Sequence, residues 1–325
     1  MNAVEPTGAP PPQKYLWVIM AANVLLALVL TASHAATSRV LFNWKFFLTF
    51  EGDQPFQSRV LPFLIADAVA LIRPFGERGL AALFVSMDLL GAIVSFIFIW
   101  KAWQAFGPKR GSLLFLFFLF WWQLFATFVV SSYNNYYYPY DMMSVAFMCV
   151  GLWMIVSRQP LIAMIILLIV AMLNRETAII IPFFYLAFNW PASRRVWQNF
   201  AWLLATCVIV KAGISIALDV TTDMVSLEHV PGFPRFYYNF AFLWLGPEYR
   251  KTLNAFFAFG FAWVLLFMPG PTDHRLRNMM WLFVPYLLGM MVVGNLSEIR
   301  IFVEFVPLLS LLLASKLTAV KEADI

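Results

Sequence analysis

Long apolar runs separated by short polar stretches fill most of the 325-residue chain. An α-helix of about 20 apolar residues crosses the ~30 Å hydrocarbon core of a bilayer, in which only helices and closed barrels satisfy their own backbone polar groups. Hydrophobic residues make up 62% of the sequence and charged residues only 12%, whereas soluble domains are about half apolar and about a quarter charged. The sequence therefore predicts an all-α protein, a polytopic bundle of membrane helices.

We expect about ten spans. They cover residues 15–33, 79–103, 112–130, 142–156, 161–173, 178–188, 197–218, 253–268, 279–294 and 301–314. Residues 60–72 are also apolar, but they contain Asp67 and would form a helix only about 20 Å long. We therefore expect an interfacial helix there, in the first outer loop, capped by Ser58 and ending before Pro74.

Basic residues orient this bundle, because short cytoplasmic loops carry an excess of Lys and Arg. If the chain begins inside, its short inner loops and carboxyl end hold Lys101, Lys109, Arg110, Arg158, Arg194, Arg195, Arg275, Arg277, Lys316 and Lys321. The outer loop 131–140 has no Lys or Arg. Residues 1–14 would then be a disordered cytoplasmic tail, 15–317 a single transmembrane domain, and 318–325 a second cytoplasmic tail. The net charge of +5 suits an anionic membrane surface and requires no nucleic-acid partner.

This topology places nearly every polar cluster on the outer face. The stretch from residue 51 to residue 59 carries the carboxylates of Glu51 and Asp53 together with Arg59. A carboxylate suits proton transfer and an arginine suits phosphate binding. A solvated loop closed by a helix cap explains the same residues without any chemistry.

A tyrosine-rich stretch, residues 131–141, holds Asn134, Asn135, Tyr138 and Asp141. Aromatic faces and amides suit sugar rings, whose C–H faces stack and whose hydroxyls need donors and acceptors. The alternative is an aromatic belt at the membrane interface, with Asp141 stabilising the amino terminus of the next helix.

Asn174, Arg175 and Glu176 interrupt an otherwise apolar sequence. Ionisable groups near membrane depth are costly and usually functional. We expect Arg175 to bind phosphate and Glu176 to bind a hydroxyl or an arginine. Neighbouring helical residues point about 100° apart, so these two need not pair. The alternative is an Asn-capped turn with a structural ion pair.

The last cluster precedes the final span. Arg300 and Glu304 are four residues apart, so on an α-helix they would share a face and pair, which leaves Glu298 for another partner. Asp88 lies within an expected span, either as a proton-relay or substrate group or as a hydrogen-bonded core carboxyl.

Other chemistry has weaker support. Cys149 and Cys207 lie in apolar runs and are expected to be buried free thiols. His229 has no second ligand at metal spacing, so we predict no metal site, although a divalent cation stays open as a cofactor. The chain has no nucleophile elbow, P-loop or dinucleotide fingerprint.

The chain resembles the GT-C type membrane glycosyltransferases. Residues 298–307, Glu-Ile-Arg-Ile-Phe-Val-Glu-Phe-Val-Pro, are similar to the E-x-R-F…P motif of lipid-linked mannosyltransferases, and Asp53 stands where that superfamily has an acidic residue in its first outer loop. The expected interfacial helix follows in the same loop. Leu296-Ser297 replaces a common His-Lys, and Glu51-Gly52-Asp53 replaces a paired Asp-Glu.

This resemblance implies a multi-pass protein, expected in a bacterial inner membrane, that transfers a sugar from a polyprenyl-phosphate donor on the outer face. Arg59, Arg175 and Arg300 would hold the donor phosphate, and Asp53 would be the general base with Glu51 in reserve. The substrate-binding residues would be Asn134, Asn135, Tyr138, Asp141, Asn174, Glu176 and Glu298. The alternatives are a transporter or flippase for a polar lipid or glycolipid, and a non-catalytic component of a polysaccharide-synthesis complex. Membrane lipid is a partner in each case.

Overall fold

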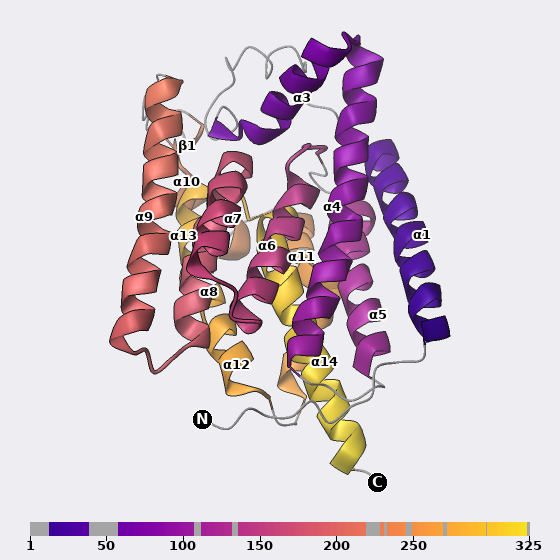
Figure 1. The fold of residues 1–325 in the computed structure, drawn as a ribbon, viewed down its shortest axis with the longest axis vertical. Coiled ribbons are helices and arrows are strands. Elements are labelled where there is room, and N and C mark those ends of the chain that lie inside the picture. Colours follow the sequence, from indigo (N-terminus) through magenta and orange to yellow (C-terminus); the bar gives the residue numbers. More distant parts are fainter. Residues whose placement is uncertain are drawn as a thin grey trace.

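The computed structural model describes residues 13–38, 58–106, 112–131, 136–218, 228–230, 233–244, 249–268, 272–296 and 298–323. These residues form a bundle of helices (Figure 1), as the sequence predicts. A short antiparallel pair of strands, β1 (Glu228–Val230) and β2 (Phe233–Pro234), accompanies them.

Six helical segments in the described residues are long and apolar enough to cross a membrane. They are α1 (Gln13–Thr37), α4 (Glu77–Ala105), α5 (Ser112–Phe125) with the π-helical turn η2 (Ala126–Val130), α9 (Arg194–Ala217), α12 (His274–Met280) with α13 (Phe283–Val293), and the 3₁₀ segment η6 (Ile299–Phe305) with α14 (Val306–Ala323). The protein is therefore a multi-pass integral membrane protein.

Shorter helices fill the rest of the bundle. They are α3 (Leu61–Ile72), α6 (Asp141–Val156), α7 (Leu161–Asn174), η3 (Glu176–Ile179) with α8 (Ile180–Phe188), α10 (Arg235–Trp244), α11 (Tyr249–Phe256) and η5 (Ala258–Phe267). Four of the ten predicted spans coincide with α6, α7, α8 and η5, which are shorter than a full span. The predicted interfacial helix coincides with α3.

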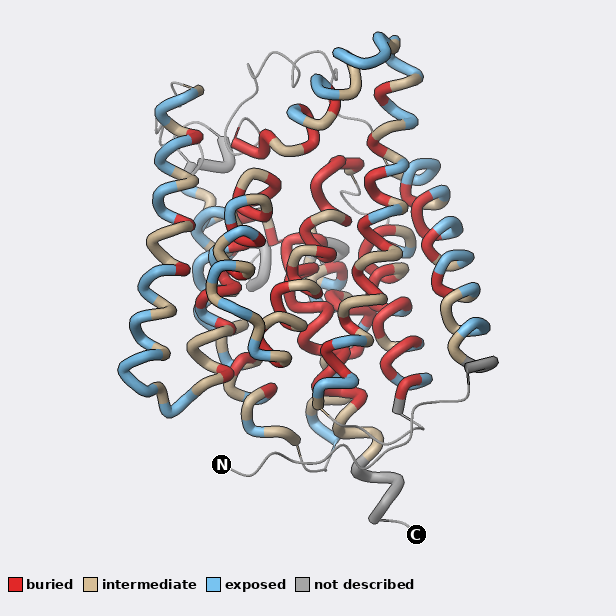
Figure 2. Tube along the Cα trace, viewed as in Figure 1, coloured by how far each residue is buried: buried red, intermediate tan, exposed pale blue. Residues whose placement is uncertain are grey.

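The outward sides of the bundle are exposed (Figure 2), and many of the exposed residues there are large and apolar. Leu25 of α1 is 61% exposed and Ile209 of α9 is 69% exposed. A helix that is apolar on every side is typical of a membrane span, because its outer face contacts lipid rather than water.

Close helix packing forms the core. A Cβ atom added at Gly91 of α4 would lie 3.0 Å from the backbone carbonyl carbon and oxygen of Met142 in α6. Gln123 of α5 donates a hydrogen bond of 2.8 Å to Ser310 of α14. Cys149 and Cys207 are buried free thiols, as predicted.

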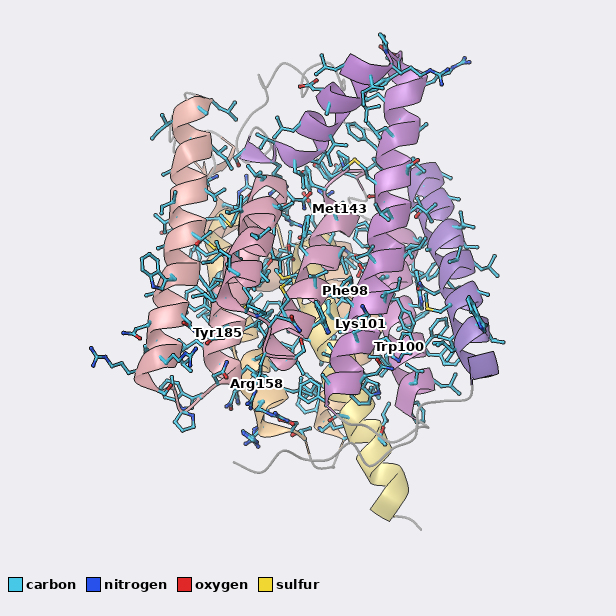
Figure 3. All side chains as sticks on the ribbon, in the orientation of Figure 1. Phe98, Trp100, Lys101, Met143, Arg158 and Tyr185 are labelled. Carbon is cyan, nitrogen blue, oxygen red and sulfur yellow. The ribbon has the colours of Figure 1, made fainter. Side chains whose placement is uncertain are left out.

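The two ends of the bundle differ. The first turn of α1 and the last turns of α14 lie at one end, and α3 lies across the other (Figure 1). Lys101 and Arg158 lie toward the first end, whereas Met143 lies toward α3 (Figure 3). The first turn of α6 and the last turn of α7 lie beneath α3 (Figure 1), whereas the segment that joins α6 to α7 lies toward the first end.

The start of α3 differs from the prediction. The helix begins at Leu61 and its N-cap is Val60, which provides no side-chain cap; Pro62 in the first turn has no backbone N–H that would need one. The helix ends at Ile72, before Pro74, as predicted. Phe63 and Ala66 pack in one apolar cluster with Phe84 of α4 and with Tyr137.

Gly91→Ala should destabilise the protein by about 1–3 kcal/mol, because the added methyl group meets backbone that cannot rotate away. Gly213→Ala in α9 is the matched control, since nothing lies within 4 Å of its added Cβ. The control should be neutral or stabilising by up to about 1 kcal/mol. Thermal unfolding in detergent measures both, and equal effects would contradict the tight contact of α4 with α6.

Candidate functional site

Seven charged side chains gather beneath α3. We call this group the arginine–carboxylate cluster; its members are Arg59, Arg175, Arg300, Asp141, Glu176, Glu298 and Glu304. Four segments far apart in the sequence supply them: the residues before α3, the start of α6, the α7–η3 junction and η6. All three arginines are buried. Buried charges are stable only when they are paired and hydrogen-bonded, so the cluster fixes how these segments meet.

Arg59 binds Glu176 through two hydrogen bonds. Its Nη2 and Nε donate to Oε1 and Oε2 at 2.9 and 3.3 Å. The guanidinium also lies 4.5 Å from the centre of the Tyr140 ring. Burial lowers the pKa of Arg59, but Glu176 raises it more, so the pKa lies well above its usual value. Arg59 is therefore a permanent cation at this site.

Arg175 stands at the break between α7 and η3, where its backbone is extended. Its Nη1 lies 3.3 Å from Oδ1 of Asp141 and 3.2 Å from Oε1 of Glu304. Glu304 also accepts hydrogen bonds from Thr177 at 2.6 Å and from Tyr286 at 3.2 Å. Arg175 and Glu176 thus have different partners and do not pair with each other, although the backbone at Arg175 is extended in place of the helical geometry expected from the sequence.

Arg300 binds Glu298 instead of the predicted Glu304. Its Nη2 lies 2.5 Å from Oε2 of Glu298, and its Nη1 lies 3.4 Å from Oδ2 of Asp141. The predicted pairing is wrong because residues 299–305 form a 3₁₀-helix. With three residues per turn, positions four apart no longer share a face. Glu298 therefore pairs with Arg300 through Oε2, and its Oε1 accepts a hydrogen bond of 3.3 Å from Nδ2 of Asn295.

Tyrosines and backbone complete the surroundings of Arg300. Its Nη1 donates to the carbonyl of Tyr136 at 3.0 Å, and its guanidinium lies 3.8 Å from the centre of the Tyr138 ring. Burial raises the pKa of the Tyr140 hydroxyl even though Arg59 lowers it, so this hydroxyl keeps its proton. A planar guanidinium stacked on a ring can still donate from its edge, and that of Arg300 donates to Glu298, Asp141 and the carbonyl of Tyr136.

Three buried polar atoms at this site have no hydrogen-bond partner within the described part of the chain: Nε of Arg175, Oδ1 of Asn174 and the hydroxyl of Tyr140. Nδ2 of Asn174 donates to the carbonyl of Tyr140 at 3.0 Å, so these residues are neighbours. Buried polar groups nearly always have partners. A ligand that carries acceptor oxygens and hydroxyl groups would satisfy all three.

The structure brings together eight of the twelve residues predicted for the site. They are Arg59, Tyr138, Asp141, Asn174, Arg175, Glu176, Glu298 and Arg300. Glu51, Asp53, Asn134 and Asn135 lie outside the described residues. Sequence reasoning missed Tyr286, whose hydroxyl binds Glu304, because a single tyrosine in an apolar run gives no signal.

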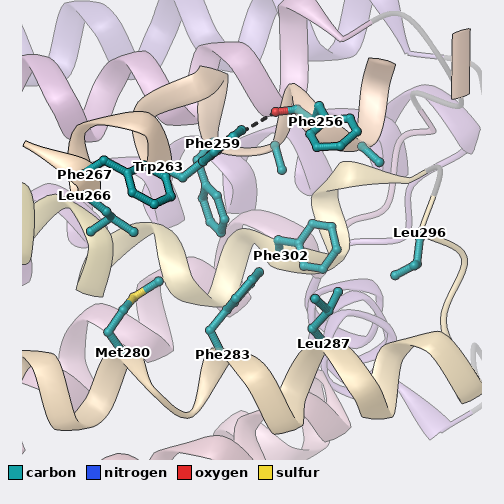
Figure 4. A pocket seen from close by; sticks show the side chains of 12 residues that line it. Phe256, Phe259, Trp263, Leu266, Phe267, Met280, Phe283, Leu287, Leu296 and Phe302 are labelled. Atoms are coloured by element: carbon teal, nitrogen blue, oxygen red, sulfur yellow. Dashed lines mark hydrogen bonds between the residues drawn. The ribbon is translucent and has the colours of Figure 1, made fainter. Parts of the chain in front are cut away.

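An apolar pocket of about 370 Å³ lies on another side of η6 (Figure 4). Phe259 of η5, Phe283 and Leu287 of α13, and Phe302 of η6 line it. Leu296, which also lines it, is four residues before Arg300. The pocket suits a hydrocarbon chain, and its lining residue Leu296 is close in sequence to the arginine–carboxylate cluster.

The described residues contain no group of three or more His, Cys, Asp or Glu that could hold a metal ion. No protein-family model, curated protein or solved structure matches the chain. The fold and the site define a multi-pass membrane protein with a buried arginine-rich centre.

Asp141→Asn should destabilise the protein by about 3–5 kcal/mol, because Arg175 and Arg300 would lose a shared buried carboxylate. Asp273→Asn is the control: Asp273 pairs with Arg275 at 2.6 Å near the surface, with side chains 24% and 35% exposed. The control should cost less than about 1 kcal/mol. Thermal unfolding compares the two variants, and a small loss of stability in Asp141→Asn would mean that the cluster does not stabilise the bundle.

Proposed function

We propose that the protein is an integral-membrane glycosyltransferase that takes its sugar from a polyprenyl-phosphate donor. The observation that carries this proposal is the convergence of three buried arginines beneath α3, with Nε of Arg175 unpartnered among the described residues. Buried arginines grouped in a membrane protein suit a lipid that carries a charged phosphate head group. Charge-assisted hydrogen bonds from arginine are the strongest contacts available to such a group.

The carboxylates define how a phosphate would bind. An arginine has five N–H donors, and among the described residues Nε of Arg175 is a buried donor that no carboxylate engages. The described cluster holds three arginines and four carboxylates, so a phosphate must compete for the guanidinium groups. In sugar transfer the phosphate gains negative charge as the bond to the sugar carbon breaks. Arginines held in place before the reaction stabilise that charge without reorganisation.

The apolar pocket supports a lipid-linked donor over a soluble sugar nucleotide. Its lining between η5, α13 and η6 suits an isoprenoid or acyl chain, since polar groups are nearly absent from it. The stacked rings of Tyr138 and Tyr140, 5.2 Å apart, and the amide of Asn174 supply the contacts that a sugar needs.

Asp53 is the proposed general base. It takes the proton of the acceptor hydroxyl as that oxygen attacks the sugar carbon and the carbon–oxygen bond to the phosphate breaks. Asp53 lies six residues before Arg59 in the sequence, which limits their separation to about 20 Å of extended chain. Asn134 and Asn135 complete the proposed sugar-binding set, and Glu51 is the alternative base.

The proposal includes the number of membrane spans and their orientation. The four short helices complete ten spans, both termini face the cytoplasm of a bacterium, and residues 34–78 lie outside. Cysteines placed at positions 54 and 109 test this arrangement: a membrane-impermeant reagent added to intact cells should label position 54 and not position 109. Labelling of position 109 would reverse the orientation.

Arg175→Ala and Arg300→Ala should each weaken binding of a polyprenyl-phosphate sugar by about 1.5–3 kcal/mol, the scale of a charged hydrogen bond. Arg275→Ala is the control, since Arg275 pairs with Asp273 outside the cluster. Binding is measured by native mass spectrometry on folded protein in detergent. Unchanged affinity in both variants would make these arginines structural ions.

Asp53→Asn should leave donor binding intact but lower sugar transfer by about 10²–10⁴-fold, the usual contribution of a general base. Glu51→Gln should cost much less, because the two carboxylates occupy different positions along the chain. Transfer is measured at equal amounts of folded protein. If Glu51→Gln is inactive and Asp53→Asn is not, Glu51 is the base; if both are active, the proposed base is wrong.

A flippase or transporter for a polar lipid is the second candidate. The observation in its favour is a buried acid–base pair, His34 and Asp88, between α1 and α4. Movement of a fluorescent polyprenyl-phosphate analogue across proteoliposomes, without sugar transfer, would support it. Transfer without such movement would support the enzyme.

A further inference from the structure

A second polar centre lies where α1, α4 and the residues before α6 meet. His34 lies in the last turn of α1 and Asp88 lies inside α4, and both are fully buried. Nδ1 of His34 and Oδ2 of Asp88 are 3.3 Å apart. An acid and a base buried together in a membrane protein are expensive and usually functional. The sequence pointed to Asp88 alone, and the structure adds its partner.

Aromatic rings enclose the imidazole of His34. The ring centres of Phe128 in η2 and of Tyr137 each lie 4.9 Å from it. Aromatic faces attract a cation placed against them. Nε2 of His34 is buried and has no hydrogen-bond partner in the segments that the structure describes. The ring thus has a carboxylate at one nitrogen and an unengaged nitrogen opposite.

We propose that His34 and Asp88 form a binding site for one exchangeable proton inside the bundle, and that its occupancy controls how strongly the arginine–carboxylate cluster binds an anion. With the proton bound, imidazolium and carboxylate sum to zero charge. When the proton leaves Nε2 for water, a neutral imidazole and a carboxylate remain, and the pair carries one negative charge.

Two routes connect this site with the cluster. Asp88 interacts electrostatically with Asp141, which binds Arg175 and Arg300. The hydroxyl of Tyr137 interacts with Asp88, and Tyr137 stands between Tyr136 and Tyr138, which both contact Arg300. Within the described residues, the titratable groups acting on Asp88 are His34, Tyr137 and Asp141.

The sign of the coupling follows from these charges. Loss of the proton adds one negative charge near Asp141, and this charge repels an incoming anion. Anion affinity should therefore fall as the pH rises through the titration of the pair. Interactions between these buried charges are weakly screened by salt, because the groups lie inside a low-dielectric bundle.

The proton is measured first, because its coupling to an anion rests on the proposed phosphate site. The chain has three histidines, His34, His229 and His274, so ¹⁵N-histidine NMR in detergent gives few signals, and His34→Gln identifies the one from His34. That signal should change from imidazolium to neutral imidazole between about pH 5 and pH 9. A signal that does not change over this range overturns the proposal.

The coupling is measured with farnesyl methyl phosphate, a diester that lacks the second phosphate ionisation near pH ~6. The affinity of the protein for this diester should fall by about fivefold or more from about pH 5.5 to pH 8.5, because fivefold is about the smallest typical coupling between two sites. Asp88→Asn should remove the pH dependence, and His274→Gln, which changes an exposed histidine in α12, should keep it. If Asp88→Asn does not fold, His34→Gln replaces it.

The outcomes separate the two proposals. If His34 titrates but the affinity for the diester depends on pH in the same way in the Asp88→Asn and unmodified proteins, the coupling is overturned. A titrating His34 with no diester binding at any pH supports the proton site and overturns the phosphate site. If His34 titrates and Asp88→Asn removes the pH dependence of diester affinity, both the proton site and the phosphate site are supported.

Discussion

Pairing of buried charge is the constraint on which the structure of this protein depends. A guanidinium cannot remain in a low-dielectric interior without carboxylates and acceptors around it. Asp141 binds two arginines, one with each carboxylate oxygen. Through them it joins the start of α6 to the α7–η3 junction and to η6. The contact of Arg175 with Glu304 and the hydrogen bond from Asn174 to the carbonyl of Tyr140 strengthen the same junction. Apolar packing favours a compact bundle, and the ion pairs select which helix ends meet.

The short helices are a consequence of this constraint. If α7 continued beyond Asn174 as one helix, Arg175 and Glu176 would be fixed about 100° apart around that helix. The extended backbone at Arg175 instead lets Arg175 and Glu176 reach different partners, one deep in the bundle and one beside α3. The same break leaves Nε of Arg175 and Oδ1 of Asn174 without partners in the described segments. Structural stability and ligand binding are thus linked at one backbone position.

The sequence predicts the bundle and much of the polar centre, for a physical reason. A charged residue buried in an apolar protein is costly unless it is paired, so Arg59, Arg175 and Arg300 could be predicted to lie together with carboxylates. Their pairings could not be predicted. The pairing of Arg300 with Glu298 depends on a 3₁₀ rather than an α-helical turn, a difference of backbone geometry that the residues do not encode locally. His34 and Asp88 are 54 positions apart, and only the packing of α1 against α4 brings them into contact.

The claim tested most directly is that the three arginines bind a lipid phosphate. The measurement is a cryo-electron microscopy structure of the protein in nanodiscs that contain a polyprenyl-phosphate sugar. The account predicts phosphate density within about 3.2 Å of Nε of Arg175, with the chain running toward Phe302 and Phe283. Lipid phosphate bound elsewhere, with Arg175 still held only by Asp141 and Glu304, would contradict it.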